Sequence, residues 1–202
     1  MLSAIILAAG EASRMGRPKA LLQWRGRPFL EHVCDALRRA GVEDRVVVLG
    51  RTSFEILAAW TPAGEIVAVN LKPENGQFSS LRTGLEAASE YSEAYMVCLA
   101  DQPTVLPETY KKIIDFWLLN KNSIVIPRTI RPSDSILKRG HPIIIPAGYR
   151  HLCFEGPLDE GLHWVTHSPS VNIADLEVAD RGIIRDFDTP EDYDSLVRLE
   201  KQ

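Results

Sequence analysis

Cationic side chains and two glycines follow the first apolar run of the chain. Segment 7–22 reads LAAGEASRMGRPKALL, and it places Arg14 and Lys19 after Gly10, with Gly16 between them. A glycine permits a sharp turn, and backbone N–H groups exposed in such a turn can bind phosphate oxygens. Arginine offers a planar fork of donors and lysine a mobile point charge. The segment therefore predicts a loop that binds an anion, with a solvated basic turn as the alternative.

Two common nucleotide-binding motifs are absent from this loop. No Ser or Thr follows Lys19, so the loop is not a Walker A motif. The glycine spacing does not match GxGxxG, which disfavours a nicotinamide-dependent oxidoreductase.

Asp101 is the first candidate metal ligand. It follows the apolar run YMVCLA, so we expect it at the carboxyl end of a strand beside the first loop. A carboxylate there suits Mg²⁺, which prefers one or two carboxylates together with waters and substrate phosphates. The alternative is that Asp101 only caps the turn formed with Gln102 and Pro103.

Asp188 is the candidate second ligand, and Asp186 would share its face of a strand two residues earlier. The alternative is a helix start. Pro190 suits the first helical position, and the spacing of Thr189 and Asp192 is that of a capping box.

Two further polar groups lie later in the chain. Asn70, Gly76, Ser79, Ser80 and Arg82 surround the entry to a predicted helix, where hydroxyl groups and helix amides could bind a nucleotide. The alternative is a capped helix with a surface arginine. Arg139, Gly140, His141 and Pro142 lie in a less regular region, and His141 is either a substrate contact or a satisfied buried histidine.

The elements that position these residues alternate along the chain. Apolar runs predict strands covered on both faces at 3–8, 44–50, 64–70, 94–100 and 122–127. Helical patterns separate them at 27–41, 53–60, 78–91 and 107–120. This alternation predicts an open, mostly parallel α/β sheet, in which ligands bind beyond the carboxyl ends of the strands. We expect one domain over 1–202, with an irregular, acceptor-facing subregion at about 128–180.

Composition narrows the functional classes. With 23 Lys and Arg against 27 Asp and Glu, the chain lacks the broad basic surface that nonspecific nucleic-acid binding needs. Cys34, Cys98 and Cys153 show no metal-binding or disulfide spacing. The apolar start is too short to span a bilayer and is unlike a signal peptide. We expect a cytoplasmic protein without membrane or nucleic-acid partners.

Five sequence blocks together resemble the MobA-like nucleotidyltransferases, and most closely their molybdenum cofactor cytidylyltransferase (MocA-like) branch. The blocks are LAAGEASRMGRPKALL, NLKPENGQFSSLRTGL, CLADQPTV, RGHPIIIP and DFDTPEDY, and they are spread in family order over nearly the whole chain. Two departures stand out. Ala100 replaces the usual glycine before Asp101, and GPLDEGLHWV replaces Gly-Asp-x-Gly-Ala-Arg, so the acceptor is less defined than the nucleotide chemistry.

The resemblance implies a Rossmann-like three-layer sandwich with a mostly parallel, mixed sheet of the GT-A-like nucleotidyltransferase type. It implies a Mg²⁺-dependent enzyme that transfers CMP from CTP to the terminal phosphate of a molybdenum-pterin cofactor and releases pyrophosphate. A molybdenum hydroxylase or its maturation factor would be the protein partner. LAAG, with Ala9, resembles the cytidylyl branch, whereas the guanylyl branch usually has LAGG.

The resemblance also distributes roles among the residues. Arg14, Lys19 and Asp101 would be catalytic, and Asp101 and Asp188 would bind the metal. The nucleotide would contact Leu7, Ala8, Ala9, Gly10, Arg14, Lys19, Asn70, Ser79, Ser80 and Arg82. The acceptor would contact Gln102, Arg139, Gly140, His141 and Asp159.

Three other functions remain open. The same fold could act on a sugar phosphate or another phosphorylated acceptor, or use GTP. A noncatalytic carrier could bind the cofactor and deliver it. A nicotinamide oxidoreductase is the third.

Overall fold

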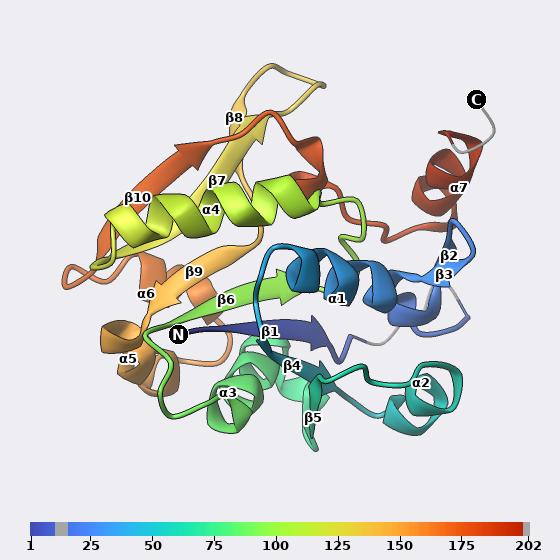
Figure 1. Cartoon of the computed structure of the whole chain (residues 1–202), viewed down its shortest axis with the longest axis horizontal. Coiled ribbons are helices and arrows are strands. Elements are labelled where there is room, and N and C mark those ends of the chain that lie inside the picture. Colours follow the sequence, from blue (N-terminus) through green and yellow to red (C-terminus); the bar gives the residue numbers. More distant parts are fainter. Residues whose placement is uncertain (11–15, 200–202) are drawn as a thin grey trace.

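A single mixed sheet forms the centre of the protein (Figure 1). The computed structural model describes residues 1–10 and 16–199. The strands follow one another across the sheet in the order β10-β7-β9-β6-β1-β4-β5, and β8 pairs with β7 off this path. Their bounds are β1 Leu2–Ala8, β4 Asp44–Leu49, β5 Ile66–Val69, β6 Ala94–Leu99, β7 Ser123–Ile130, β8 Leu137–Arg139, β9 Ile143–Pro146 and β10 Asn172–Glu177.

Strand β1 lies in the middle of the parallel part of the sheet. It pairs in parallel with β4, where Ile5 faces Val46, and with β6, where Ile6 faces Cys98. Strand β9 runs antiparallel between β6 and β7, and β10 runs parallel to β7 at the edge. The ends of β1, β4 and β6 therefore meet at one edge, where a ligand site is expected in sheets of this kind.

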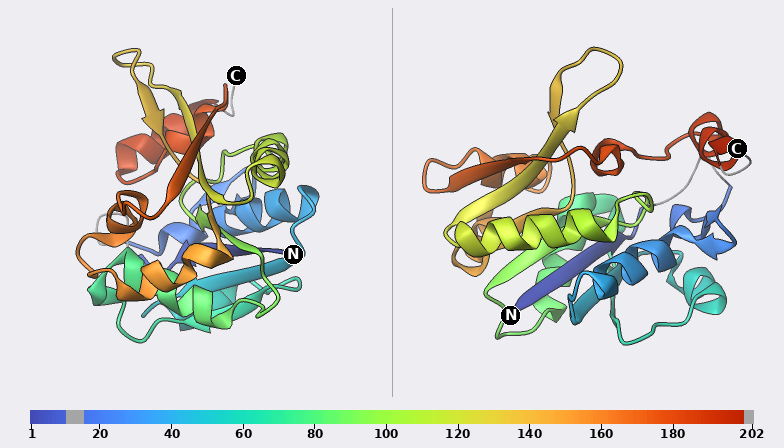
Figure 2. Two further views of the ribbon diagram at one scale, coloured as in Figure 1. Left: turned by 90° about the vertical axis from the view of Figure 1, so that its left-hand side faces the viewer. Right: turned by 45° about the horizontal axis from the view of Figure 1, so that its top comes forward.

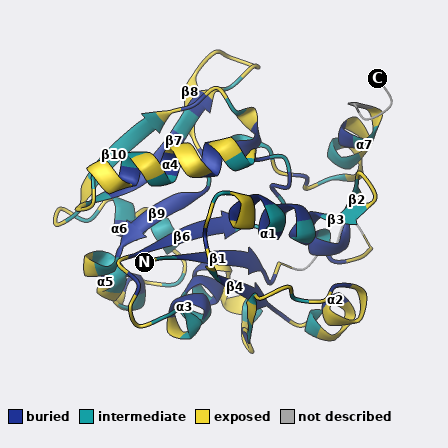
Figure 3. Cartoon of the chain, in the orientation of Figure 1, coloured by how far each residue is buried: buried dark blue, intermediate teal, exposed yellow. Residues whose placement is uncertain are grey.

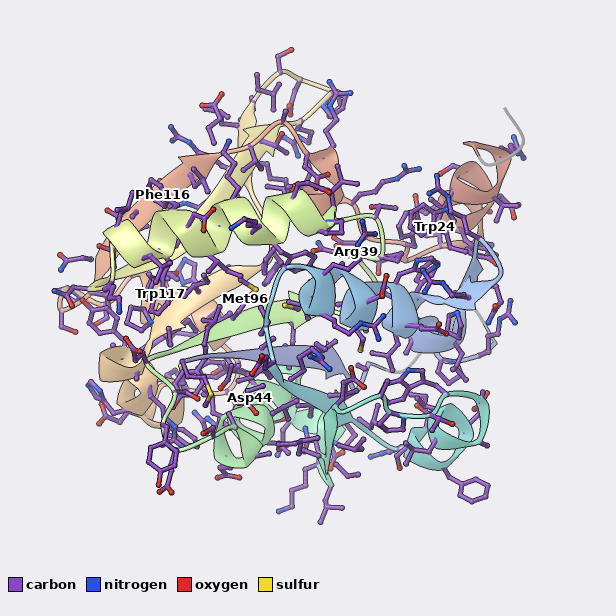
Figure 4. All side chains as sticks on the ribbon, viewed as in Figure 1. Trp24, Arg39, Asp44, Met96, Phe116 and Trp117 are labelled. Carbon is purple, nitrogen blue, oxygen red and sulfur yellow. The ribbon has the colours of Figure 1, made fainter. Side chains whose placement is uncertain are left out.

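Helices cover both faces of the sheet, which makes three layers (Figures 1 and 2). Helices α1 (Phe29–Arg39) and α4 (Pro107–Leu119) pack on one face, and α3 (Gln77–Ala87), α5 (Arg150–Glu155) and α6 (Gly161–Thr166) pack on the other. A hydrophobic core lies on each face of the sheet. Met96 of β6 and Trp117 of α4 belong to the core on the face covered by α1 and α4, and both are labelled in Figure 4. Burial is highest along the central strands (Figure 3).

The strands and helices predicted from periodicity are all present. The three cysteines, Cys34, Cys98 and Cys153, are free and buried. Within the described residues, no helix is both long and apolar enough to cross a bilayer.

Region 128–180 is more regular than its turn-rich sequence indicated. It contains β8, β9, α5, α6 and β10, and these strands extend the same sheet. Their sequence signals are weak because each strand is short or half exposed, so alternation and apolar runs are hard to recognise.

A small third core attaches the end of the chain to the first loop. Phe187 packs on Phe29 with ring centroids 5.4 Å apart, and Leu22 and Leu196 complete the cluster. Helix α7 (Pro190–Leu199) begins with the predicted capping box: Thr189 and Asp192 exchange side-chain to backbone hydrogen bonds of 3.1 and 3.2 Å. This cluster brings segment 186–188 beside the 3₁₀ turn η1 (Lys19–Leu21).

The shorter elements link these layers. They are the hairpin of β2 (Gln23–Trp24) and β3 (Arg27–Pro28), helix α2 (Ser53–Ala59), and the 3₁₀ turns η2 (Pro73–Asn75), η3 (Ala147–Tyr149) and η4 (Arg181–Ile184). Asp180 caps η4 and also accepts hydrogen bonds from Leu106 N and the Thr109 hydroxyl, so it fixes η4 against the start of α4.

Gly84 allows α3 to approach the sheet closely, and its replacement by alanine should destabilise the protein. A Cβ at this position would lie 2.3 Å from Ile5 Cγ2 and 2.9 Å from Val48 Cγ2. We expect Gly84→Ala to lower the free energy of unfolding by about 1–3 kcal/mol, because overpacking outweighs the gain in helix propensity. Urea unfolding measures this difference. Gly148→Ala is the control, since a Cβ there meets nothing within 4 Å. Equal stability of the two variants would contradict the close packing.

Candidate functional site

A cavity of about 380 Å³ opens at the edge of the sheet where β1, β4 and β6 end. Its walls come from the turn after β1, from η1, from the loop after β4, from the start of α3 and from the end of β6. The lining residues are Leu7, Ala8, Ala9, Gly10, Lys19, Ala20, Arg51, Pro73, Glu74, Gly76, Gln77, Ser80, Leu99, Ala100 and Asp101. The cavity therefore brings together the first loop, the predicted metal ligand Asp101 and the predicted nucleotide contact Ser80.

The turn after β1 lines this cavity. Ala100 N donates to Leu7 O at 3.1 Å, which joins the ends of β1 and β6. The loop after β4 packs against the same turn, and a Cβ at Gly50 would lie 2.8 Å from Ala9 O. Only glycine allows this approach. By contrast, a Cβ at Gly10 would meet nothing within 4 Å, so the backbone there borders open space.

Lys19 lies between two carboxylates at the mouth of the cavity. Its Nζ is 3.1 Å from Asp101 Oδ2, and it also donates to Asp188 Oδ1. Asp101 follows β6, as the sequence predicted, whereas Asp188 is brought here by the burial of Phe187. The Lys19 and Asp101 side chains are 23% and 21% exposed, so their charges are less screened than at the open surface.

Burial and neighbouring charges shift both pKa values in this group. Burial disfavours the charged form of Lys19, but hydrogen bonds and charges from Asp188 and Asp101 outweigh it, so the pKa of Lys19 is raised. Burial raises the pKa of Asp101, with Lys19 opposing and the nearby charges of Asp186 and Asp188 adding to the rise. The site is thus rich in carboxylates that need a cation.

The donor set fits a hard divalent cation. Asp101 Oδ2 and Asp188 Oδ1 converge on one ammonium group, and oxygen ligands are those that Mg²⁺ and Mn²⁺ prefer. In the part of the chain that the structure describes, no group of three or more His, Cys, Asp or Glu side chains is arranged to hold a metal. A two-carboxylate site would complete its coordination with water and substrate oxygens, as Mg²⁺ sites usually do.

Asp186 has a different neighbour from the one expected. Segment 185–189 is not a strand, so Asp186 and Asp188 do not share a strand face. Asp186 Oδ1 accepts from Gln102 Nε2 at 2.7 Å, and Gln102, which is buried, also donates to Ile183 O. Gln102 therefore holds the segment that carries Asp186 against the end of β6.

His141 lies beside Asp186 and is mostly buried. Its backbone N donates to Ile183 O at 2.9 Å. Burial lowers the pKa of the imidazole to about 4, although the Asp186 charge acts in the opposite direction. Gly140 is enclosed as well, since a Cβ there would meet Ile183 O at 2.0 Å. Both residues thus pack directly against η4.

Arg139 points elsewhere. Its guanidinium makes a two-pronged ion pair with Asp175 of β10, at 2.7 and 2.8 Å, on the exposed surface. Within the RGHP block, Arg139 therefore pairs with β10 at the edge of the sheet, whereas Gly140 and His141 lie beside η4 and Asp186.

Asn70 organises the entry to α3 from a buried position. Its Nδ2 donates to Ser79 Oγ at 2.8 Å and to Ser80 Oγ at 3.0 Å, while its Oδ1 accepts from Lys72 N at 2.9 Å. These bonds tie the loop before α3 to its first turn, but they do not cap the helix, whose N-cap is Gly76 without a side-chain cap hydrogen bond. Ser80 lines the cavity all the same, so Asn70 fixes the orientation of a hydroxyl group there.

Arg82 connects α3 to α5. Its Nε donates to Cys153 O at 2.8 Å, a terminal nitrogen donates to Gly156 O, and the guanidinium lies over the Phe78 ring. It is not among the residues that line the cavity. These contacts give the side chain a structural role. No pattern in the sequence around Arg82 predicted its hydrogen bonds, because the carbonyl groups that accept them lie more than seventy residues away.

A second cavity, of about 470 Å³, adjoins the first and contains Asp159. The two share Leu7, Glu74, Gly76 and Gln77. The remaining lining residues are Asn75, Phe78, Leu81, Leu158, Asp159, Gly161 and Leu162. Gly140 and His141, with which the resemblance had grouped Asp159, are not among the residues that line this cavity.

Arg51 and Glu74 are lining residues that the sequence analysis missed. They form an ion pair of 2.9 Å at the wall of the first cavity. Arg51 follows Gly50 at the carboxyl end of β4, so the strand-end rule that selected Asp101 also indicates this position. Arg14 lies outside the described residues.

Burial of a neutral histidine makes stability depend on pH. The pKa of His141 is about 4 in the folded protein against 6.5 for an ordinary histidine, so between these values the unfolded chain binds more protons. Stability should be complete above pH 6.5 and fall as the pH drops towards 4, by at most about 3 kcal/mol. Urea unfolding at several pH values measures this, and His141→Gln should flatten the profile over this range. The exposed His151→Gln is the control, and an unchanged slope in His141→Gln would refute the prediction.

Solved structures of similar fold cover almost the whole chain. Rv0371c from Mycobacterium tuberculosis H37Rv is 28% identical, with a TM-score of 0.85 over 98% of this chain and 97% of that one. Its complex with manganese aligns with a TM-score of 0.79 at 26% identity, over 98% of each chain. The α/β nucleotidyltransferase fold expected from the sequence is therefore correct.

Curated relatives carry different names. Nicotine blue oxidoreductase from Paenarthrobacter nicotinovorans is 32% identical over 147 residues, which are 72% of this chain and 71% of that protein. Molybdenum cofactor guanylyltransferase from Xanthomonas euvesicatoria pv. vesicatoria is 46% identical over 54 residues, 27% of this chain and 29% of that protein. The model of the MobA-like NTP transferase domain matches residues 4–169, which include the first loop, Asp101 and both cavities. The chain is therefore a member of the MobA-like NTP transferase domain family.

Proposed function

We propose that this nucleotidyltransferase transfers CMP from CTP to the terminal phosphate of a molybdenum-pterin cofactor and releases pyrophosphate. The observation that carries the proposal is the position of Lys19 with Asp101 and Asp188 at the mouth of a cavity formed by the first loop. A triphosphate needs cations and backbone N–H groups, and its transfer needs charge neutralisation at the α-phosphate.

The residues have distinct roles in this reaction. A terminal phosphate oxygen of the acceptor attacks the α-phosphorus, and the bond from that phosphorus to the pyrophosphate oxygen breaks. Lys19 neutralises charge at the α-phosphate, the backbone near Gly10 holds phosphate oxygens, and Arg14 binds the departing pyrophosphate. Ser80, oriented by Asn70, would contact the nucleoside. Arg82 would contribute indirectly by fixing α3.

Asp101 and Asp188 would hold Mg²⁺ or Mn²⁺. The bound ion would polarise phosphate oxygens and offset the charge that develops in the transition state. The support comes from the convergence of two carboxylate oxygens on one cation, together with the manganese complex of Rv0371c.

The reaction needs no strong base, because a phosphomonoester is already anionic at neutral pH. Catalysis then rests on positioning and on charge neutralisation. His141 is neutral at that pH, so it can accept or donate a hydrogen bond to an acceptor without adding charge.

The second cavity is suited to the body of the acceptor. It adjoins the nucleotide cavity and is lined by apolar side chains such as Phe78, Leu81 and Leu162. Among the described residues that line it, carboxylates are present and no lysine or arginine is. We infer that the acceptor places an uncharged, hydrogen-bond-donating part near Asp159 and directs its phosphate towards Lys19.

The choice of nucleotide rests on the first turn. Ala9 lines the cavity, and a glycine in its place would leave more room for a purine. The similarity to a molybdenum cofactor guanylyltransferase keeps GTP as the second candidate.

An oxidoreductase is the second candidate function. The similarity to nicotine blue oxidoreductase over 72% of the chain favours it, whereas the missing GxGxxG motif does not. Binding of reduced nicotinamide nucleotides, measured by fluorescence, separates the two functions.

Pyrophosphate release tests the proposed transfer directly. With Mg²⁺ and purified molybdenum-loaded pterin cofactor, we expect release with CTP and little with GTP, ATP or UTP. Release with GTP alone would instead assign a guanylyltransferase. Binding of CTP without release would point to another phosphorylated acceptor, such as a sugar phosphate, or to a carrier. No nucleotide binding at all would refute the proposal.

Loss of the central charges should reduce turnover. We expect Lys19→Met and Asp101→Asn to lower kcat by roughly 10²–10³-fold, because electrostatic groups of this kind contribute several kcal/mol in the transition state. Lys111→Met and Asp115→Asn are matched controls, since they interrupt an exposed ion pair on α4. Near-normal turnover in both site variants would show that the chemistry occurs elsewhere.

A further inference from the structure

The ammonium group of Lys19 occupies the point on which both proposed metal ligands converge. Nζ donates to Asp101 Oδ2 and to Asp188 Oδ1 at the same time. The two carboxylates come from residues 82 and 169 positions further along the chain, so this is a site assembled by the fold. The same two oxygens therefore serve a cation that belongs to the protein itself.

The backbone of Lys19 is held by hydrogen bonds, whereas its side chain is long and has several rotatable bonds. Ala20 and Leu21 are buried, Leu21 N donates to Pro18 O at 2.9 Å, and Leu22 N donates to Lys19 O at 3.0 Å. Four flexible methylene groups connect this fixed turn to the ammonium, so Nζ can move while η1 stays in place. Lys19 also lines the first cavity, where the phosphates would lie.

A divalent cation and this ammonium cannot occupy the site together. Two cations sharing the same pair of oxygens repel each other strongly where water is partly excluded, and the Asp101 side chain is only 21% exposed. Asp188 is 56% exposed, which gives an incoming ion a path from solvent. Either cation neutralises the two carboxylates. Which of them occupies the site therefore depends on whether Lys19 has another anion to bind.

We propose that Lys19 fills the metal site in the free protein, and that the nucleotide triphosphate draws it away and so allows the metal to bind. This inference rests on the proposed metal role of Asp101 and Asp188. Lys19 then acts twice: it keeps metal out of the site before the nucleotide binds, and it neutralises phosphate once the nucleotide is present. Metal and nucleotide binding are therefore coupled through one side chain.

Manganese binding without nucleotide tests the first half of this proposal. Titration followed by electron paramagnetic resonance measures free and bound Mn²⁺ directly. We expect weak binding by the wild type and at least about tenfold tighter binding by Lys19→Met, which keeps the length of the stem without the charge. Lys19→Arg should bind as weakly as the wild type, and Lys111→Met is the distant control. Adding Asp101→Asn to Lys19→Met should abolish the gain.

Three results would overturn it: equal Mn²⁺ affinity of Lys19→Met and wild type, a gain that persists when Asp101 is also replaced, or an equal gain in Lys111→Met. Circular dichroism and thermal unfolding establish that each variant is folded. If Lys19→Met is not folded, Lys19→Gln replaces it in both measurements.

Nucleotide binding in the presence of EDTA tests the second half. Asp188→Asn removes one partner of Lys19, so the ammonium should reach the phosphates more readily. We expect several-fold tighter CTP binding by isothermal titration calorimetry, with no such gain for Asp115→Asn. The gain should vanish in a Lys19→Met background. A gain that is equal with and without the Lys19 charge would overturn the proposal.

These measurements separate the inference from the proposed function. Mn²⁺ binding requires neither CTP nor an acceptor, so exchange of the two cations would still be observed if no nucleotide supported transfer. Conversely, pyrophosphate release with CTP together with unchanged Mn²⁺ affinity in Lys19→Met would support the function and reject the exchange.

Discussion

One ammonium group, that of Lys19, joins three segments that are distant in sequence. The segments are the loop after β1, the end of β6 and the stretch before α7. Each brings a charge that would be unfavourable alone in a partly buried position, and together they neutralise one another. The position of Asp188, and with it the acidic wall of the site, depends on this contact and on the burial of Phe187 beside it.

The sheet provides the rigid frame behind this contact. Parallel pairing of β1 with β4 and β6 brings three strand ends to one edge, and glycine at positions 50 and 84 lets a loop and a helix come close to them. Close packing of this kind leaves few alternative arrangements, so the side chains at the edge are held in place. The flexible parts of the site are then its long side chains, and the ammonium of Lys19 foremost.

The two adjoining cavities differ in polarity. The first cavity contains cations, carboxylates and backbone amides, as a nucleotide triphosphate requires, while the second is mainly apolar with carboxylates at its rim. Glu74, paired with Arg51, lies where the two meet. The side chain of buried Gln102 and the backbone N–H of His141 hold the segment that carries Asp186 against β6. Charge is therefore concentrated where phosphates would meet and is reduced where the rest of an acceptor would lie.

The sequence alone determined the alternation of strands and helices, the placement of Asp101 at the end of β6 and the capping box of α7. Each of these depends on neighbours within about ten residues, which set periodicity, turns and caps. The fold class followed from these local features. The family followed from segment 7–22 together with the four other sequence blocks that resemble the family pattern. Only the tertiary structure decided that Arg82 binds the Cys153 carbonyl group of α5, that Arg139 pairs with Asp175, and that Arg51 and Glu74 line the cavity. It also decided that Asp188 meets Lys19, because an ion pair between residues 169 positions apart exists only after the chain has folded.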